Sequence, residues 1–282
     1  YQLAVQWQHE NGEISTLWQP RHTDRGFDSE NRLLDGSVAE NVLSHIQGQF
    51  GHIEKIDHET KHEPPPLPYS LSALQVAAGK KFGYSPQTVL DTMQSLYEAK
   101  LTTYPRSDCD FLPGNQFQDA AKILRFLTVL SELSPAISQV NPAQKSRAWN
   151  DKKISAHHAI IPTQLAPDME ALTETQRNLY VLIAKAYIAQ FLPNYEYVTT
   201  KLVISCAGER FLAQGKHEDA FGWRLLYPMK KEGTEHEEIY RKTQDLEKCA
   251  WHRNRSYESN HYRGAAKGQP IPQIRKETSC AH

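Results

Sequence analysis

Three adjacent residues, Tyr104, Pro105 and Arg106, could together act on a phosphodiester. Proline fixes its own φ and favours extended geometry at the residue before it. Because side chains two apart in an extended segment point the same way, the sequence predicts that Tyr104 and Arg106 share one face. A guanidinium there would favour the phenolate form of the tyrosine and hold a phosphate bidentately. Taken alone, however, a Tyr-Pro-Arg sequence is typical of a buried tyrosine and a surface arginine near a turn.

The residues before this segment predict strands and then helices. Apolar and polar residues alternate over residues 1–8, and Asn11-Gly12 is a hairpin signal with a return strand over residues 14–18. A capping box that begins at Ser37 predicts a helix, and a proline-rich connector over residues 63–68 is a plausible domain boundary.

Beyond the connector the pattern is mainly helical. Apolar stripes predict helices over residues 71–82, 86–97 and 117–127, and the first two lead directly to Tyr104. We interpret these stripes, Tyr97 included, as core packing only. A capping box at Thr173 opens a further helix, and residues 198–206 alternate as a strand with one buried face.

Composition limits the class of protein. Hydrophobic residues make up 39% of the chain, below the usual share for a compact domain, so we expect an open shape or a poorly folded part. The net charge is −1, so any nucleic acid must bind a local groove. Four cysteines without a C-x-x-C spacing indicate free thiols in a reducing cytoplasm. No apolar run approaches the ~20 residues of a membrane span. The chain begins inside a strand pattern, which we interpret as the start of a fragment.

Three motifs carry a resemblance to a known family. In chain order they are LPYSLSALQ (residues 67–75), TTYPRSD (residues 102–108) and SAHHAIIPT (residues 155–163). They resemble the type IA DNA topoisomerases, and most of all the bacterial topoisomerase III branch, over residues 1 to about 228. The resemblance implies a DNA topoisomerase that cuts one strand through a 5′-phosphotyrosine, passes a strand and religates without ATP.

The resemblance also implies a multidomain α+β fold, in which a β-rich arch domain receives an inserted, mostly helical domain that carries the tyrosine. We expect the first part of the arch over residues 1–62, the helical domain over 63–168 and the return part of the arch over 169–228. Residues 229–282 hold few aliphatic and many charged side chains, which predicts a disordered tail. We interpret this tail as an out-of-frame or spliced-on end, and an ordinary basic tail is the alternative.

The family's site residues transfer to matching positions here. Tyr104 would be the nucleophile, Arg106 would clamp the phosphate, and His157 would help to hold the scissile phosphate. Without the family, two adjacent histidines are more often one buried and one exposed. Asp108 is first a turn or cap residue, and each lysine taken alone is an ordinary solvated charge. The expected contacts with single-stranded DNA are Ser72, Gln75, Lys80, Lys100, Asp108 and His158.

One part of the family pattern is missing. In the family, a Toprim domain supplies the metal and acid-base chemistry through a glutamate, an acidic cluster and a lysine. Nothing in this chain matches these residues, so we predict no metal ligands here. We therefore expect a cytoplasmic, monomeric chain that is inactive unless a Toprim domain is supplied. The alternative is a catalytically inactive fragment that retains single-stranded DNA binding. A tyrosine recombinase would need several arginines and a His-x-x-Arg pattern, which the sequence lacks.

Overall fold

The computed structural model describes residues 1–9, 12–20, 26–30, 32–154, 156–227, 234–253 and 261–264. The chain divides into two compact units. The strand unit comprises Tyr1–Lys61, Tyr197–Asp219 and Lys230–His282, and the helical unit comprises His62–Glu196 and Ala220–Met229. Within the described ranges no helix is long and apolar enough to cross a membrane. The mixed α and β class is confirmed.

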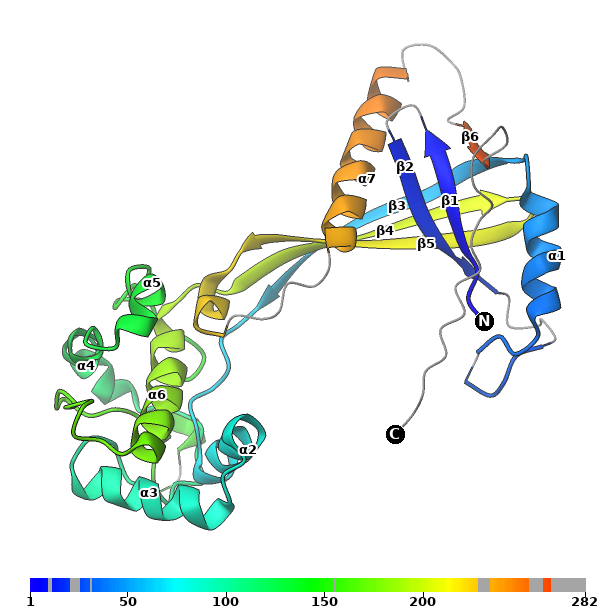
Figure 1. The fold of residues 1–282 in the computed structure, drawn as a ribbon. Coiled ribbons are helices and arrows are strands. Elements are labelled where there is room, and N and C mark those ends of the chain that lie inside the picture. The colour runs from blue at the N-terminus through cyan, green and yellow to red at the C-terminus, as the bar shows by residue number, and fades with distance from the viewer. Residues whose placement is uncertain are drawn as a thin grey trace. The chain divides into compact units, whose positions relative to one another are not determined.

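The strands form a closed barrel in the order β1-β2-β5-β4-β3-β6 (Figure 1). The pairs β1–β2, β1–β6, β2–β5 and β3–β6 are antiparallel. The strands are β1 (Ala4–His9), β2 (Gly12–Gln19), β3 (Phe50–Glu63), β4 (Tyr195–Cys206), β5 (Glu209–Ala220) and β6 (His261–Gly264).

The predicted N-terminal hairpin is confirmed. Val5 pairs with Thr16 and Trp7 pairs with Ile14, and all four side chains are buried. The Trp7 indole Nε1–H donates to Thr16 Oγ1 at 2.7 Å, so the one polar side chain of this group is satisfied inside the barrel. Asn11, half of the turn signal, lies outside the described residues.

Helix α1 (Gly36–Ile46) begins two residues earlier than the capping box predicts. Its N-cap is Asp35, whose carboxylate accepts the Ser37 N–H at 2.9 Å. Because Asp35 already supplies this cap, Ser37 lies inside the first turn. The helix buries Ala39, Val42 and Ile46 in the core of the strand unit.

Helix α7 (Thr234–Arg253) corrects the prediction of a disordered tail over residues 229–282, as does β6. The helix packs inside the strand unit with Ile239, Thr243 and Leu246 buried. The described part of this region therefore finds enough buried contacts to be ordered, despite its polar composition. The remaining residues of the predicted tail lie outside the described ranges.

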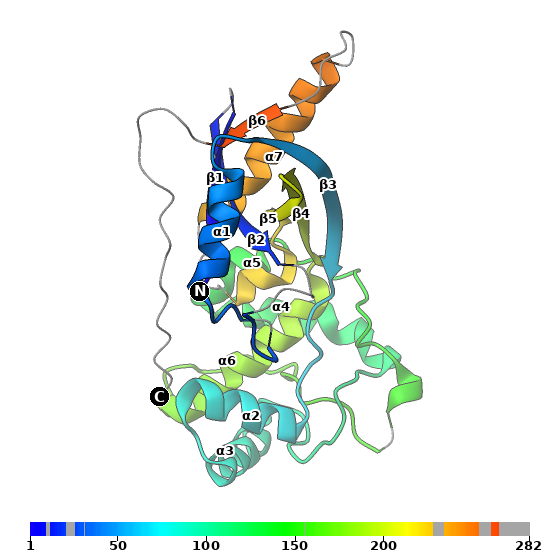
Figure 2. The same ribbon diagram turned by 90° about the vertical axis from the view of Figure 1, so that its right-hand side faces the viewer.

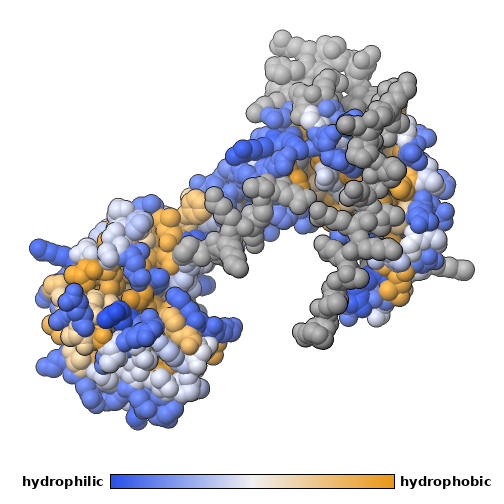
Figure 3. All heavy atoms as spheres, in the orientation of Figure 1, coloured by the Kyte–Doolittle hydropathy of each residue, from blue (hydrophilic) through white to orange (hydrophobic). Residues whose placement is uncertain are grey.

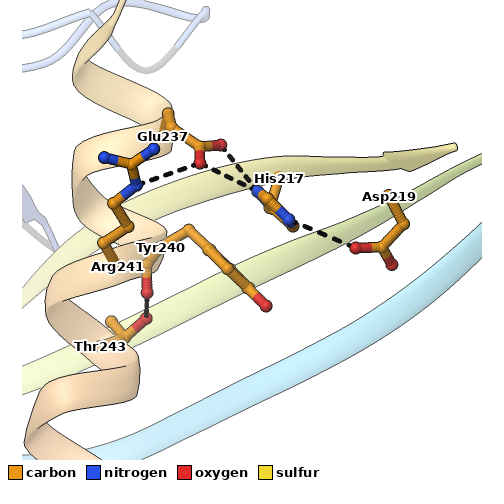
Figure 4. Close-up of polar contacts among 6 residues, drawn as sticks. All are labelled: His217, Asp219, Glu237, Tyr240, Arg241 and Thr243. Atoms are coloured by element: carbon orange, nitrogen blue, oxygen red, sulfur yellow. Dashed lines mark hydrogen bonds and ion pairs between the residues drawn. The ribbon is translucent and has the colours of Figure 1, made fainter. Parts of the chain in front are cut away.

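His217 connects β5 to α7 (Figure 4). Its Nδ1 lies 2.9 Å from Glu237 Oε1 on the helix, and its Nε2 lies 3.4 Å from Asp219 Oδ1 on the strand. The Tyr240 ring stacks on the imidazole with 4.6 Å between centroids and 5° between planes. Arg241 Nε in turn lies 3.3 Å from Glu237 Oε1. Polar and aromatic contacts thus dock this helix, together with its few buried aliphatic side chains.

The helical unit contains the elements that carry the three motifs. α2, α3 and α6 lie side by side in both ribbon views (Figures 1 and 2). Its helices are α2 (Leu71–Phe82), α3 (Pro86–Glu98), α4 (Ala120–Leu127), α5 (Ser134–Ile137) and α6 (Glu174–Ile188). Short 3-10 turns are η1 (Gly114–Asp119), η2 (Ser131–Leu133), η3 (Asp151–Lys153), η4 (Ala189–Phe191) and η5 (Gly222–Leu226).

Local signals place these helices correctly. Ser85 caps α3 with Pro86 in its first turn, and Thr173 forms a reciprocal capping box with Gln176 at the start of α6. The predicted helix over residues 117–127 is part 3-10 turn (η1) and part α-helix (α4). The apolar stripes of these helices meet in one buried core. At the surface of this unit, apolar side chains are interspersed among polar ones (Figure 3).

Gly215 on β5 allows the close approach of α7, and its replacement tests that packing. A Cβ at Gly215 would lie 2.7 Å from the Tyr240 main-chain N and 3.1 Å from the His236 carbonyl O. Because both atoms belong to helix backbone, Gly215→Ala would push α7 away. We expect it to lower the free energy of unfolding by about 1–3 kcal/mol. Urea denaturation measures this loss, and hydrogen exchange should localise the faster opening to α7.

Gly79→Ala is the matched control, because its Cβ would make an ordinary 3.5 Å contact with the Tyr84 carbonyl O. Alanine is favoured over glycine inside a helix by about 0.5–1 kcal/mol, so this change should stabilise α2. Wild-type stability and wild-type α7 exchange in Gly215→Ala would contradict the close packing.

Candidate active site

Main-chain hydrogen bonds hold the Tyr104 segment against the segment that carries the two histidines. Thr103 N–H donates to Ile161 O at 3.0 Å, and Thr163 N–H donates to Leu101 O at 3.0 Å. The Thr103 hydroxyl accepts the Ile161 N–H at 3.0 Å and donates to Ala159 O at 3.3 Å. Two motifs more than fifty residues apart in sequence therefore form one short antiparallel bridge.

The first motif joins the same arrangement. Ile160 N–H donates to Tyr69 O at 2.8 Å, and Leu71 N–H donates to Ser107 O at 2.8 Å. All three motifs are thus hydrogen-bonded to one another through their main chains. Local geometry around Tyr104 consequently depends on all three segments at once.

The Tyr104 and His157 side chains lie in contact. Their ring centroids are 4.3 Å apart with 32° between the planes. Tyr104 is 37% exposed and His157 is also exposed, so a ligand in solvent can reach both. The structure therefore brings together two of the three predicted catalytic residues.

Exposure along this segment agrees with the alternation that the sequence predicts. Tyr104 and Arg106 are both exposed, whereas Pro105 and Ser107 are buried, although Pro105 and Arg106 form a turn. Arg106 is exposed, and it makes no hydrogen bond or ion pair within the described ranges. Its guanidinium donors are free to bind an anion.

The neighbouring histidine, His158, is half-buried and held from both sides. Its Nδ1 lies 2.8 Å from Ala159 O, and its Nε2 lies 3.1 Å from the Gln116 amide Nε2. A carbonyl oxygen only accepts, so Nδ1 carries the proton and Nε2 accepts from Gln116. Burial lowers the pKa of His158 below its ordinary 6.5, and the neighbouring His157 lowers it further. Of the two adjacent histidines, His158 is therefore held in place and neutral, and His157 is exposed.

Three predicted DNA contacts lie on α2. Ser72 and Lys80 are exposed, and the Ser72 hydroxyl lies 3.4 Å from that of Ser70, the N-cap of the helix. Gln75 donates its side-chain amide to Pro86 O at 3.0 Å, so it also braces the start of α3. No sequence pattern indicates this bracing contact.

Lys100 and Asp108 lie on either side of Tyr104, and both are exposed. Lys100 has a left-handed backbone with φ of 61°. The role of turn or cap residue, which we expected for Asp108, belongs to Asp110, whose Oδ1 accepts the Ser70 N–H at 2.9 Å. Asp110 is half-buried, whereas Asp108 is exposed.

Comparison with known proteins identifies the family. A family model described as DNA topoisomerase matches residues 1–260. The chain belongs to this family. The resemblance to type IA enzymes of the topoisomerase III branch is confirmed by the relatives: DNA topoisomerase 3 of Pasteurella multocida is 40% identical over 227 residues, and that of Haemophilus influenzae is 41% identical over 228 residues. They cover 79% and 80% of this chain, respectively.

The chain spans 35% of the length of these two relatives. Among solved structures, the full-length topoisomerase I from Thermotoga maritima is similar with a TM-score of 0.55 and 18% identity, over 81% of this chain and 36% of that one. At this identity the likeness shows the fold alone. The family model extends to residue 260, whereas these two relatives match over 227 and 228 residues, which is about the extent that we expected.

The lowered pKa of His158 predicts how stability depends on pH. The unfolded chain protonates this imidazole near 6.5, whereas the folded chain does so only at lower pH. Below 6.5 the unfolded state therefore binds more protons, so this stabilising contribution is present above 6.5 and is lost as pH falls through the folded pKa. Histidine NMR titration should place the His158 midpoint below 6.5.

Urea denaturation at about pH 7.5 and about pH 5.5 should show a smaller loss of stability in His158→Gln than in the wild type. A His158 midpoint at or above 6.5 would contradict the buried, neutral assignment.

Proposed function

We propose that this chain carries the DNA-cleaving tyrosine of a type IA topoisomerase and that Tyr104 is the nucleophile. The observation that carries the proposal is the exposed Tyr104 ring in contact with His157, inside motifs that place the chain in this family. A tyrosine that served only the core would be buried like Tyr180 or Tyr187, which lie in the same unit.

The proposed step exchanges one phosphodiester for another. The Tyr104 hydroxyl oxygen attacks the phosphorus of single-stranded DNA, and the bond from phosphorus to the 3′ oxygen breaks. The phenolic proton passes to solvent, and the leaving 3′ oxygen takes a proton to become a hydroxyl. The 5′ phosphate stays on Tyr104 until the 3′ hydroxyl attacks in reverse. Because a diester exists on both sides of the step, religation needs no ATP.

Arg106 and His157 have different proposed roles. Arg106 is two residues from the nucleophile with its donors unpaired in the described ranges, which suits a clamp on a phosphate oxygen. His157 lies against the Tyr104 ring and is exposed, so its ring nitrogens can reach a phosphate bound over that ring. His158 would act indirectly, since Gln116 and Ala159 occupy its two nitrogens.

The DNA strand would be neutralised by exposed groups of the helical unit that carries the tyrosine. Lys80 and Lys100 are exposed and supply positive charge, and Ser72 supplies a hydroxyl on the same helix as Lys80. We include Gln75 and Asp108 as weaker contacts, because Gln75 is already bonded to Pro86 and Asp108 repels phosphate.

Mg²⁺ is the cofactor that the family implies. Among the described residues no group of three or more His, Cys, Asp or Glu side chains could hold a metal ion. The residues present thus do not fit the ion, and we assign no step of this chain to it. The ligands would come from a Toprim domain, which we propose as the missing partner.

Covalent trapping tests the nucleophile. The chain is mixed with end-labelled single-stranded DNA and Mg²⁺, with and without a separately expressed Toprim domain of a relative, and is then denatured. We expect a labelled protein band only with the added domain, and no band in Tyr104→Phe, because a phenyl ring has no oxygen to attack. Tyr1→Phe is the matched control, since Tyr1 is also an exposed tyrosine.

A band that survives in Tyr104→Phe would refute the assignment. The absence of a band in every mixture, with a DNA-dependent shift on a native gel, would instead favour an inactive fragment that binds single-stranded DNA. A band without the added domain would reveal a metal site within this chain.

Replacement of Arg106 separates charge from geometry. Arg106→Lys keeps the charge but loses the planar fork that binds two phosphate oxygens. We expect single-turnover cleavage to fall by about tenfold in Arg106→Lys and by about 100- to 1,000-fold in Arg106→Gln. DNA affinity, measured by fluorescence anisotropy, should change much less. Cleavage at the wild-type rate in Arg106→Gln would exclude the clamp.

A further inference from the structure

A second exposed tyrosine contacts the proposed nucleophile. Tyr97 is 41% exposed, although Met93 and Leu96 on the same helix are fully buried. Its ring meets the Tyr104 ring edge-on, with 5.9 Å between centroids and 88° between planes. The apolar stripe of α3 therefore reaches the surface in its last turn, where Tyr97 meets Tyr104.

The backbone under Tyr97 is fixed by the end of α3. Lys100 N–H donates to Tyr97 O at 2.8 Å, and Leu101 N–H donates to Leu96 O at 2.9 Å. With Lys100 left-handed, these two bonds form a Schellman motif. Tyr104 lies three residues after Leu101 and directly follows Thr103, whose N–H donates to Ile161 O. Both rings thus project from main chain that is hydrogen-bonded on each side.

The Tyr104 side chain itself has no such restraint from burial. It is exposed, and a turn follows it at once. Attack on phosphorus requires the hydroxyl oxygen within a few tenths of an ångström of its productive position, and a misplacement of about 1 Å can cost about 100-fold in rate. Edge-to-face packing is directional and restricts a ring that would otherwise exchange rotamers.

We propose that Tyr97 is a positioning residue, which holds the Tyr104 ring in its attack orientation through this edge-to-face contact. The proposal rests on the proposed role of Tyr104 as nucleophile. The Tyr97 hydroxyl makes no hydrogen bond within the described ranges, so the ring and not the hydroxyl carries the effect. Tyr97→Phe should then act like the wild type, whereas Tyr97→Leu should lose the contact.

The first readout is catalytic. With the Toprim domain supplied, Tyr97→Leu should form the covalent complex about three- to tenfold more slowly, which is the range expected for one aromatic pair. Its affinity for single-stranded DNA should stay within about twofold of the wild type, and Tyr97→Phe should restore the rate. Phe221→Leu is the matched control, because Phe221 is an exposed aromatic residue of the same unit.

The second readout needs no activity. The full chain is labelled with 3-fluorotyrosine, and the Tyr104 signal is assigned by its loss in Tyr104→Phe. ¹⁹F relaxation should report a more mobile Tyr104 ring in Tyr97→Leu, and a wild-type ring in Tyr97→Phe and Phe221→Leu. Wild-type mobility and rate in Tyr97→Leu would overturn the proposal, as would equal loss in Tyr97→Phe and Tyr97→Leu.

The two readouts distinguish two failures. If the wild type forms no covalent complex in any mixture, the proposed function fails, and the relaxation measurement still decides whether Tyr97 restrains Tyr104. If the complex forms and Tyr97→Leu matches the wild type in both readouts, only the positioning role fails.

Discussion

Two main-chain hydrogen bonds join Leu101 and Thr103 to Thr163 and Ile161, and the candidate site exists only while they hold. Bringing Thr103 and Ile161 together closes the loop between them, which costs conformational entropy. Favourable contacts at the pairing must offset that cost. Burial of Leu101, Ile160 and Ile161 supplies it, together with the two bonds of the Thr103 hydroxyl. Tyr104 and His157 flank this bridge, and their contact follows from it.

Features that depend on a few adjacent residues could be predicted from the sequence. The Ser85-Pro86 start of α3, the Thr173 box of α6 and the β1–β2 hairpin are each specified within a short window. The contact between Tyr104 and His157 could be expected only through the family motifs, because no local pattern indicates a pairing across the bridge. The shared exposure of Tyr104 and Arg106 could be predicted locally, because buried and exposed side chains alternate from Tyr104 to Asp108.

The prediction of a disordered tail was wrong for α7 because composition averages over side chains and ignores the surface on which the helix packs. Among the α7 side chains that the structure describes, Ile239, Thr243 and Leu246 are buried, and Ile239 and Leu246 join the core of the strand unit. The remaining contacts come from the sheet side, where His217 meets Glu237 and Gly215 lets the backbones approach. Neither contact is visible in the helix sequence alone, since both partners lie about twenty residues earlier on β5.

Two local costs close to Tyr104 support a functional reading of this segment. Lys100 adopts a left-handed backbone that glycine would adopt without strain, at a cost of about 1 kcal/mol. The Thr102 hydroxyl is buried without a hydrogen-bond partner in the described ranges, which costs about 1–3 kcal/mol and would be avoided by valine. Fold stability alone favours glycine and valine at these positions. Costs of this kind concentrate where function constrains the chain.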